Sequence, residues 1–145
     1  MMTQLQIGMI GVNGRGGLWR HWHQPHGRSV VVAGADIRED FLEDFRRENG
    51  LSPFITTDYR EMLARDDVDA VAVTCPDYCH EEYAIAALEA GKHVFCEKPL
   101  AITIEGCDRI LEAWQRSGKR LMVGFNMRYM AMFRVMKEVV RSEEH

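Results

Sequence analysis

A glycine-rich loop carries the first sign of chemistry in this sequence. It reads Gly11-Val12-Asn13-Gly14-Arg15-Gly16, close to the pattern G-x-G-x-x-G, in which backbone amides at a helix N-terminus hold a pyrophosphate. Gly11 and Gly16 stand at the first and third glycine positions, and Asn13 replaces the second glycine. Glycine-rich turns also occur for structural reasons alone, so the loop needs a second signal.

The second signal is an acidic residue at the end of the next apolar run. Asp36 follows Val30 to Ala35 and stands 25 residues after Gly11, near the position where a carboxylate accepts hydrogen bonds from the ribose of a dinucleotide. The alternative interpretation is a structural one, in which Asp36 caps the helix expected at 37–49. Together, the loop and the acid favour dinucleotide binding.

The charge of Asp36 bears on which dinucleotide binds. Two like charges about 4 Å apart repel by roughly 4 kcal/mol at an effective dielectric constant near 20, and about 1.4 kcal/mol already gives a tenfold preference. A carboxylate beside the ribose therefore disfavours the 2′-phosphate of NADP. We predict NAD as the cofactor and leave NADP open, because Arg38 would offset part of the repulsion if it points the same way.

A third signal is the tripeptide Glu97-Lys98-Pro99, which follows another apolar run. Ligands of open α/β sheets bind beyond the carboxyl ends of the strands. A lysine there can hydrogen-bond a substrate hydroxyl or carbonyl, and burial can lower its pKa towards the range useful for proton transfer. The alternative is a surface Glu-Lys pair before a turn proline.

Five continuous apolar runs must position these residues. Runs without polar alternation are typical of strands covered on both faces, as in a parallel sheet. They are Leu5 to Ile10, Ser29 to Ala35, Ala70 to Thr74, His93 to Cys96 and Leu121 to Phe125. Helix patterns alternate with them, so we predict an α/β fold: a doubly wound, mostly parallel, Rossmann-like sheet of about six strands.

The helix patterns carry end signals. One helix begins at Glu39 and ends at Asn49-Gly50, and another begins after the N-cap Thr103 and ends at Gly118. Two more are expected near 57–65 and 77–91. In the helix after Thr103 we expect a buried stripe at helical spacing, formed by Cys107, Ile110, Leu111 and Trp114.

The last segment, Met127 to Arg141, predicts a trailing amphipathic helix with no strand after it. Its apolar side chains fall on one stripe: Tyr129, Met130, Met132, Phe133, Val135, Met136, Val139 and Val140. We divide the chain into a dinucleotide-binding domain at 1–126 and this helix at 127–145, with no second domain. Because an uncovered apolar stripe is adhesive, we expect residues 127–141 to join copies of the chain in a homo-oligomer.

Composition narrows the class of protein. The chain has 145 residues, 46% hydrophobic and 28% charged, with a net charge of −4. This length predicts one domain, and the acidic balance offers no cationic face for nucleic acid. No apolar run approaches the roughly 20 residues of a membrane span, and the N-terminus lacks a signal-peptide pattern. We therefore expect a soluble, cytoplasmic protein with reduced cysteines that binds neither nucleic acid nor membranes.

We predict no metal, although two groups of residues have the types of metal ligands. In the first group two histidines are two residues apart, and side chains with this spacing point in different directions on a helix. The second group lies in a segment that is interpreted below as part of a cofactor cleft. The two groups are His21, His23 and His26, and Cys75, Cys79 and His80.

Taken in order, several segments resemble the N-terminal domain of the Gfo/Idh/MocA oxidoreductases, the family of glucose-fructose oxidoreductase and inositol dehydrogenase. The resemblance covers nearly the whole chain, and Glu97-Lys98-Pro99 after the Gly-Lys-His-Val strand is its most specific part. The other segments are the glycine loop, Asp36, Thr74 to His80, Ala87 to Val94 and Gly124 to Tyr129.

The resemblance implies roles at particular positions. The residues that would contact the pyrophosphate and the adenosine ribose are Gly11, Asn13, Gly14, Arg15 and Gly16, and Asp36, Ile37 and Arg38. Those that would line the rest of the cofactor cleft are Thr74, Cys75, Pro76 and Asp77, with His80 close behind, and Asn126. Glu97 and Lys98 would border the nicotinamide, and Lys98 would polarise or deprotonate the oxygen of a sugar or polyol substrate during hydride transfer.

Family members continue past Asn126 into a second α/β domain, which supplies substrate contacts and a further acid–base pair. The chain ends near the start of that domain, so we expect an NAD-binding domain that is inactive alone. Two alternatives remain. One is a free-standing, non-catalytic dinucleotide-binding or interaction module. The other is an S-adenosylmethionine-dependent methyltransferase, which leaves Glu97-Lys98-Pro99 unexplained.

Overall fold

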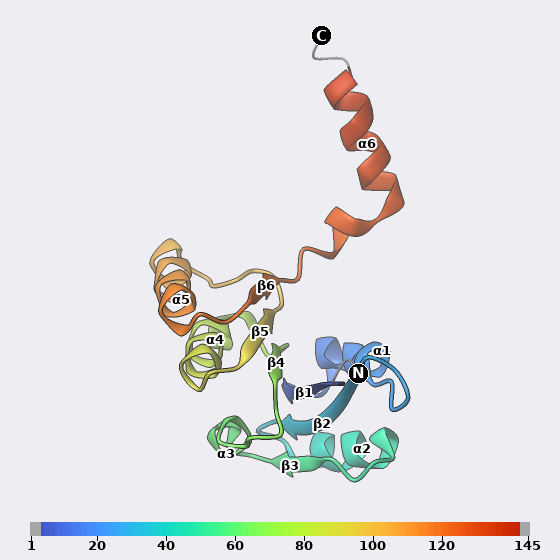
Figure 1. Cartoon of the computed structure of the whole chain (residues 1–145), viewed down its shortest axis with the longest axis vertical. Helices are drawn as coiled ribbons and strands as arrows, with labels where there is room; N and C mark the ends of the chain where they lie inside the picture. The colour runs from blue at the N-terminus through green and yellow to red at the C-terminus, as the bar shows by residue number, and fades with distance from the viewer. Residues whose placement is uncertain (1–3, 143–145) are drawn as a thin grey trace.

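Six parallel strands form one sheet in the order β3-β2-β1-β4-β5-β6 (Figure 1). The structure is a computed structural model that describes residues 4–142. The strands are β1 (Leu5–Ile10), β2 (Ser29–Ala35), β3 (Phe54–Thr56), β4 (Ala70–Val73), β5 (His93–Cys96) and β6 (Leu121–Val123). The strand order reverses between β1 and β4, which is the switch point of a doubly wound sheet. The predicted fold class is confirmed.

Helices connect the strands and begin or end at the predicted signals. Thr103 Oγ1 accepts a hydrogen bond from the Gly106 amide at 3.0 Å, and Gly50 and Gly118 end their helices with φ of 77° and 64°, where glycine has no steric penalty. The helices are η1 (Gly14–Leu18), α1 (Trp19–Trp22), α2 (Glu39–Asn49), α3 (Tyr59–Leu63), η2 (Asp77–Cys79), α4 (His80–Glu89), α5 (Ile104–Ser117), η3 (Asn126–Tyr129) and α6 (Ala131–Ser142).

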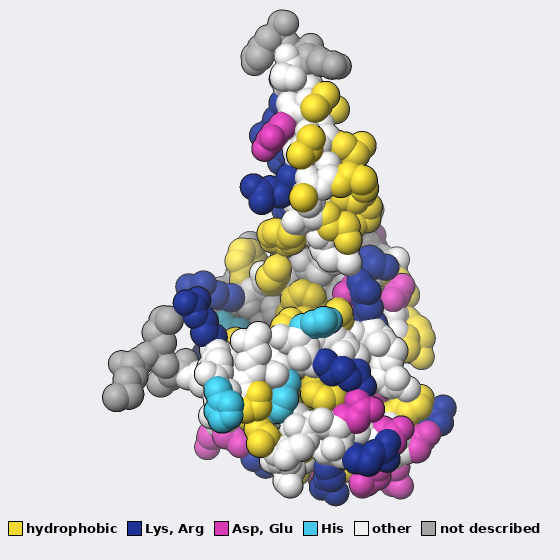
Figure 2. Space-filling view, turned by 90° about the vertical axis from the view of Figure 1, so that its right-hand side faces the viewer, with side chains coloured by type: hydrophobic (Ala, Val, Ile, Leu, Met, Phe, Trp, Pro, Cys, Tyr) yellow, Lys and Arg dark blue, Asp and Glu magenta, His cyan; other side chains and the backbone are white. Residues whose placement is uncertain are grey.

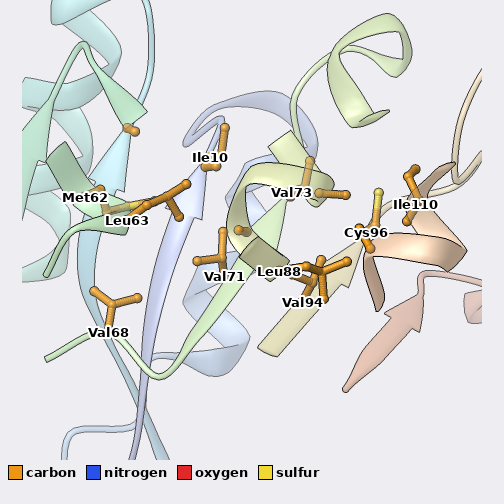
Figure 3. Close-up of a cluster of buried hydrophobic side chains, with 14 of the residues drawn as sticks. Ile10, Met62, Leu63, Val68, Val71, Val73, Leu88, Val94, Cys96 and Ile110 are labelled. Atoms are coloured by element: carbon orange, nitrogen blue, oxygen red, sulfur yellow. The ribbon is translucent and has the colours of Figure 1, made fainter. Parts of the chain in front are cut away.

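Two apolar clusters hold the helices against the two faces of the sheet. On one face, α3, α4 and α5 pack on the central strands through a cluster that includes Met62, Leu88, Ile110, Val71 and Val94 (Figure 3). On the other face, α1 and α2 pack through a second cluster, which contains Trp19, Leu42, Phe45, Met9 and Val31. Both faces of the central strands are covered, as their continuous apolar sequences predicted.

The buried face of α5 is rotated from the predicted stripe. Ile110 is fully buried, but Leu111 and Trp114 are each 38% exposed, so the expectation that they lie in the core is wrong. The buried face contains Gly106 and Ala113 instead. A Cβ at Gly106 would lie 3.0 Å from Ala101 Cβ and close to the Glu81 carboxylate of α4. Small residues therefore let α5 pack closely against α4, and this contact turns the helix.

Because of this rotation, we predict that two neighbouring truncations lower the free energy of unfolding by different amounts. Ile110→Ala leaves a cavity in the core and should lower the free energy of unfolding by about 2–5 kcal/mol. Leu111→Ala removes a similar number of atoms from a partly exposed position and should cost less than about 1 kcal/mol. Urea unfolding followed by circular dichroism measures both variants, and equal losses would contradict the packing described for α5.

The segment after β6 differs from the single helix predicted from Met127. Residues Asn126–Tyr129 form the short helix η3, Met130 is extended with ψ of 135°, and α6 begins at Ala131. α6 projects away from the sheet (Figure 1), and none of its side chains is buried. The proposed division at residue 126 stays a prediction, and the ends of its two ranges, 1–3 and 143–145, lie outside the described residues.

The apolar face of α6 is exposed along its length. Its side chains form a stripe opposite the basic residues of the same helix (Figure 2). The members that are more than half exposed are Met132, Val135, Met136, Val139 and Val140. Within residues 4–142, no helix combines the length and the apolar character needed to cross a membrane.

Candidate nucleotide site

A cavity of about 550 Å³ opens beyond the carboxyl ends of β1, β2 and β4. This is the edge of the sheet at which ligands of doubly wound folds bind. Ten of the predicted contact residues line it: Gly11, Asn13, Gly14, Arg15, Asp36, Ile37, Arg38, Thr74, Cys75 and Pro76. The predicted residues that do not line it are Gly16, Asp77, His80, Glu97, Lys98 and Asn126.

The glycine loop packs directly on the backbone at the end of β4. Gly11 has φ of +84°, and a Cβ there would lie 2.9 Å from the Cys75 amide nitrogen. A Cβ on Gly16 would overlap the carbonyl oxygen of Gly11, which accepts a hydrogen bond from Thr74 Oγ1 at 2.7 Å. These two glycines are therefore required for close backbone approach, which is also the role of the glycines in pyrophosphate-binding loops. We call the turn that they form the glycine cradle.

Asn13 fits the loop without a left-handed backbone. Its φ and ψ are −110° and 173°, and its Oδ1 accepts a hydrogen bond from the Gly14 amide at 2.7 Å. The positive φ of the turn, +55°, falls on Gly14. The replacement of the second glycine is thus accommodated, because the neighbouring glycine takes the conformation that a side chain would disfavour.

Asp36 joins the end of β2 to the glycine loop. Its Oδ2 accepts from the Val12 amide at 3.0 Å, and its Oδ1 accepts from the Arg38 amide at 3.1 Å. No side chain caps α2, whose N-cap residue is Arg38, so the alternative of an aspartate that caps this helix does not describe the structure. The carboxylate lines the cavity with both oxygens already oriented.

Four aromatic side chains, which were not predicted from the sequence as site residues, form an aromatic wall in the cavity lining. It consists of Phe41, Tyr59, Tyr78 and Tyr83. The rings of Tyr59 and Tyr83 have centroids 4.6 Å apart, and Tyr59 donates a hydrogen bond to Glu82 at 2.8 Å. Burial raises the pKa of Tyr83 to about 12, so both hydroxyls stay neutral and the wall suits a flat apolar group such as a nucleobase.

Burial keeps two of the cysteines near the strand ends in the neutral thiol form. Cys75 and Cys79 line the cavity, and burial raises the pKa of Cys75 far above its usual value. Burial also raises the pKa of Cys96 to about 12. Since the thiolate is the nucleophile and the metal ligand, Cys75 and Cys96 act as neutral packing groups. Within the described part of the chain, no three histidine, cysteine or acidic residues are grouped to hold a metal.

Glu97 connects the glycine loop to Lys98. Its side chain is buried at 4% exposure; Oε1 accepts from Arg15 Nε at 2.8 Å, and Oε2 accepts from the backbone amide of Lys98 at 2.9 Å. The alternative of a surface Glu-Lys pair is therefore wrong for Glu97, which pairs with an arginine 82 residues earlier. The Lys98 side chain is exposed at the same edge of the sheet.

His80 lies behind the cavity wall and contacts two of its loops. It is fully buried, with Nδ1 2.6 Å from the Pro99 carbonyl oxygen and Nε2 3.0 Å from the Cys75 carbonyl oxygen. It therefore supports the β4 and β5 loops rather than touching a ligand. Asp77 is exposed on η2, between the cavity residues Pro76 and Tyr78, whereas Asn126 is exposed on η3, beyond the edge strand β6.

The chain is similar to known proteins both in sequence and in fold. Residues 5–125 match the Gfo/Idh/MocA family model, described as an oxidoreductase family with an NAD-binding Rossmann fold. The chain belongs to this family. Inositol 2-dehydrogenase of Klebsiella pneumoniae is 40% identical over 138 residues, which cover 94% of this chain and 41% of that protein. The assignment favours a dinucleotide over S-adenosylmethionine in the cavity.

Solved structures of several dehydrogenases superpose closely on this Gfo/Idh/MocA chain. A probable dehydrogenase from Thermotoga maritima does so with a TM-score of 0.85 at 33% identity, over 95% of this chain and 41% of the other. The scyllo-inositol dehydrogenase of Lactobacillus casei, with bound NAD(H) and scyllo-inositol, has a TM-score of 0.88 at 24% identity, over 98% and 42%, a likeness of fold alone. The chain thus spans about two fifths of the length of these proteins.

The glycine cradle predicts an unequal effect of two adjacent substitutions. Gly16→Ala forces a methyl group onto the Gly11 carbonyl and should cost about 2 kcal/mol of unfolding free energy while displacing the loop. Gly17→Ala is the matched control, because its methyl group would meet only the mobile end of Arg20, at 3.0 Å. Chemical denaturation compares them, and a Gly16→Ala variant as stable as Gly17→Ala would disprove the close approach.

Proposed function

We propose that this chain is the NAD(H)-binding domain of an oxidoreductase that transfers hydride between a nicotinamide and a hydroxyl-bearing carbon of a polyol or sugar. The observation that carries the proposal is Asp36, a carboxylate oriented by the Val12 amide beside the glycine cradle and facing a cavity. Support also comes from the family match and from the name of the Klebsiella relative, an inositol 2-dehydrogenase. A cyclic polyol is the substrate class we propose.

The residues present fit a dinucleotide along its length. Gly11 and Gly16 leave space for a pyrophosphate, Asp36 offers free lone pairs to the ribose hydroxyls, and the aromatic wall offers an apolar surface to adenine. When bound, the nicotinamide would supply the hydride acceptor or donor. We assign the predicted contacts outside the cavity, Asp77, Glu97 and Asn126, to the nicotinamide end.

Lys98 is the residue of this chain that we propose to act on the substrate. In the oxidation direction the carbinol carbon gives up a hydride and its hydroxyl gives up a proton, and a lysine at the oxygen can polarise the O–H bond or take that proton. Glu97 orients the Lys98 backbone through its Oε2 and is itself held by Arg15. The substrate contacts and the second acid–base group would come from a further domain, so we propose little or no turnover by residues 1–145 alone, in a cytoplasmic setting.

This proposal predicts NADH binding that depends on Asp36. Asp36→Asn keeps the size of the side chain but weakens its hydrogen bonds to the ribose, so NADH affinity should fall by about tenfold or more. Titration of NADH fluorescence with the 145-residue chain measures the change. Asp44→Asn, which alters an exposed acid on α2 that does not line the cavity, is the control. A folded chain that binds no NADH, or an unchanged affinity in Asp36→Asn, would refute the proposal.

A second, non-catalytic role is favoured by the exposed stripe on α6, through which we propose that the 145-residue chain self-associates. Burying apolar side chains between two copies is favourable by roughly 25 cal/mol per Å². Light scattering should therefore give a mass above that of the monomer, and Met136→Glu should lower it. Lys137→Gln changes the charge by the same amount on the polar face and should leave the mass unchanged. A wild-type monomer at high concentration would exclude this association.

A further inference from the structure

Arg38 lies on the cavity wall two residues after Asp36, but its guanidinium is already bound. Nε donates to Asp40 Oδ1 at 2.9 Å, and Nη2 donates to the other oxygen of the same carboxylate. Its Cζ lies 4.1 Å from the centroid of the Phe41 ring. The hydrogen bonds to Asp40 raise the pKa of Arg38, and those same bonds lower the pKa of Asp40. The two hydrogen bonds to the Asp40 carboxylate and the contact with the Phe41 ring thus hold the guanidinium in one orientation.

The cavity therefore has no unpaired arginine near the ribose position. Arg15 and Arg38 are the two arginines of its lining; Arg15 is bound by Glu97, and Arg38 is bound by Asp40. Asp36 is left as the charge that a ribose substituent would meet. A free 2′-hydroxyl can donate to this carboxylate, whereas a 2′-phosphate would meet a like charge with no cation available to neutralise it.

We propose that Asp40 is a specificity-determining residue, which makes the site select a dinucleotide with a free 2′-hydroxyl and reject one with a 2′-phosphate. Asp40 does not line the cavity, so it acts through Arg38 as a positioning residue. This inference rests on the proposed NAD(H) function and deepens it, because it names a second acid, besides Asp36, that sets the choice of cofactor.

The selection is a competition between two anions for one guanidinium. Arginine binds a carboxylate and a phosphate with the same forked geometry. An exposed ion pair contributes little to folding stability, but Asp40 lies only two residues from Arg38, on the first turn of the helix that Arg38 begins, so its carboxylate is always close to the guanidinium in sequence. Contact with Phe41 adds to the ordering. A 2′-phosphate must displace the Asp40 carboxylate before it can form hydrogen bonds with the Arg38 guanidinium.

The test is Asp40→Asn in the 145-residue chain, titrated separately with NADH and NADPH. The variant removes one negative charge and frees Arg38 to turn towards a 2′-phosphate. NADPH affinity should rise by about tenfold, and NADH affinity should change by less than about twofold, because the 2′-hydroxyl is uncharged. The gain for NADPH should shrink at high salt, since exposed charges are screened.

Glu39→Gln is the matched control. Glu39 is also exposed on the first turn of α2, so this variant removes the same charge from the same helix end without releasing Arg38. It should shift the ratio of NADPH to NADH affinity by less than about twofold. The double variant Asp40→Asn with Arg38→Gln should lose the gain, because the released cation is gone. Circular dichroism confirms that all variants are folded.

The outcomes separate this inference from the proposed function. If the wild-type chain binds NADH through Asp36 but Asp40→Asn leaves the affinity ratio unchanged, or shifts it no more than Glu39→Gln does, the role of Asp40 is refuted and the NAD(H) function stands. A gain that persists in the double variant also refutes it, since Arg38 would then not be involved. If the folded wild-type chain binds no NADH, both proposals fall together.

Discussion

Backbone contact between the glycine loop and the end of β4 is the constraint on which the rest of the site depends. Gly11 lies against the Cys75 backbone, and Gly16 lies against Gly11, so two strands adjacent in the sheet are joined at their carboxyl ends without intervening side chains. Thr74 closes this junction with hydrogen bonds to the Ile10 and Gly11 carbonyls. Any side chain at either glycine would separate the two loops.

The loops around the cavity are linked to one another by buried and partly buried polar groups. Asp36 links β2 to the glycine loop, Glu97 links that loop to the β5 end, and His80 links the β5 end to the β4 end. Buried polar groups are costly unless they are paired, and no unpaired buried side-chain N or O atom occurs within residues 4–142. The cavity is therefore pre-formed by mutual hydrogen bonding among its walls.

Much of this arrangement was predictable because parallel strands end at one edge of a sheet. The glycine loop, Asp36 and Thr74 each follow a strand whose apolar run is plain in the sequence, and they meet in the structure as expected. The strand at 54–56 was not predicted, because three half-buried residues leave no periodic pattern. Tyr59 fell in the helix predicted near 57–65, but nothing in the local sequence indicates that its ring lines the cavity. The ion pair between Arg15 and Glu97 joins residues that are 82 positions apart in the sequence. No local sequence pattern predicts such a pair.

The two edge strands are too short to favour the addition of a further strand to the sheet. β3 and β6 are each three residues long and pair on one side only. An edge this short presents too few free amides and carbonyls to template another strand, and natural β-proteins use short borders to avoid edge-to-edge aggregation. Chain-to-chain contact through strand addition is thereby discouraged at both borders. Contact with other protein surfaces would therefore be made through side chains, such as the exposed apolar row on α6.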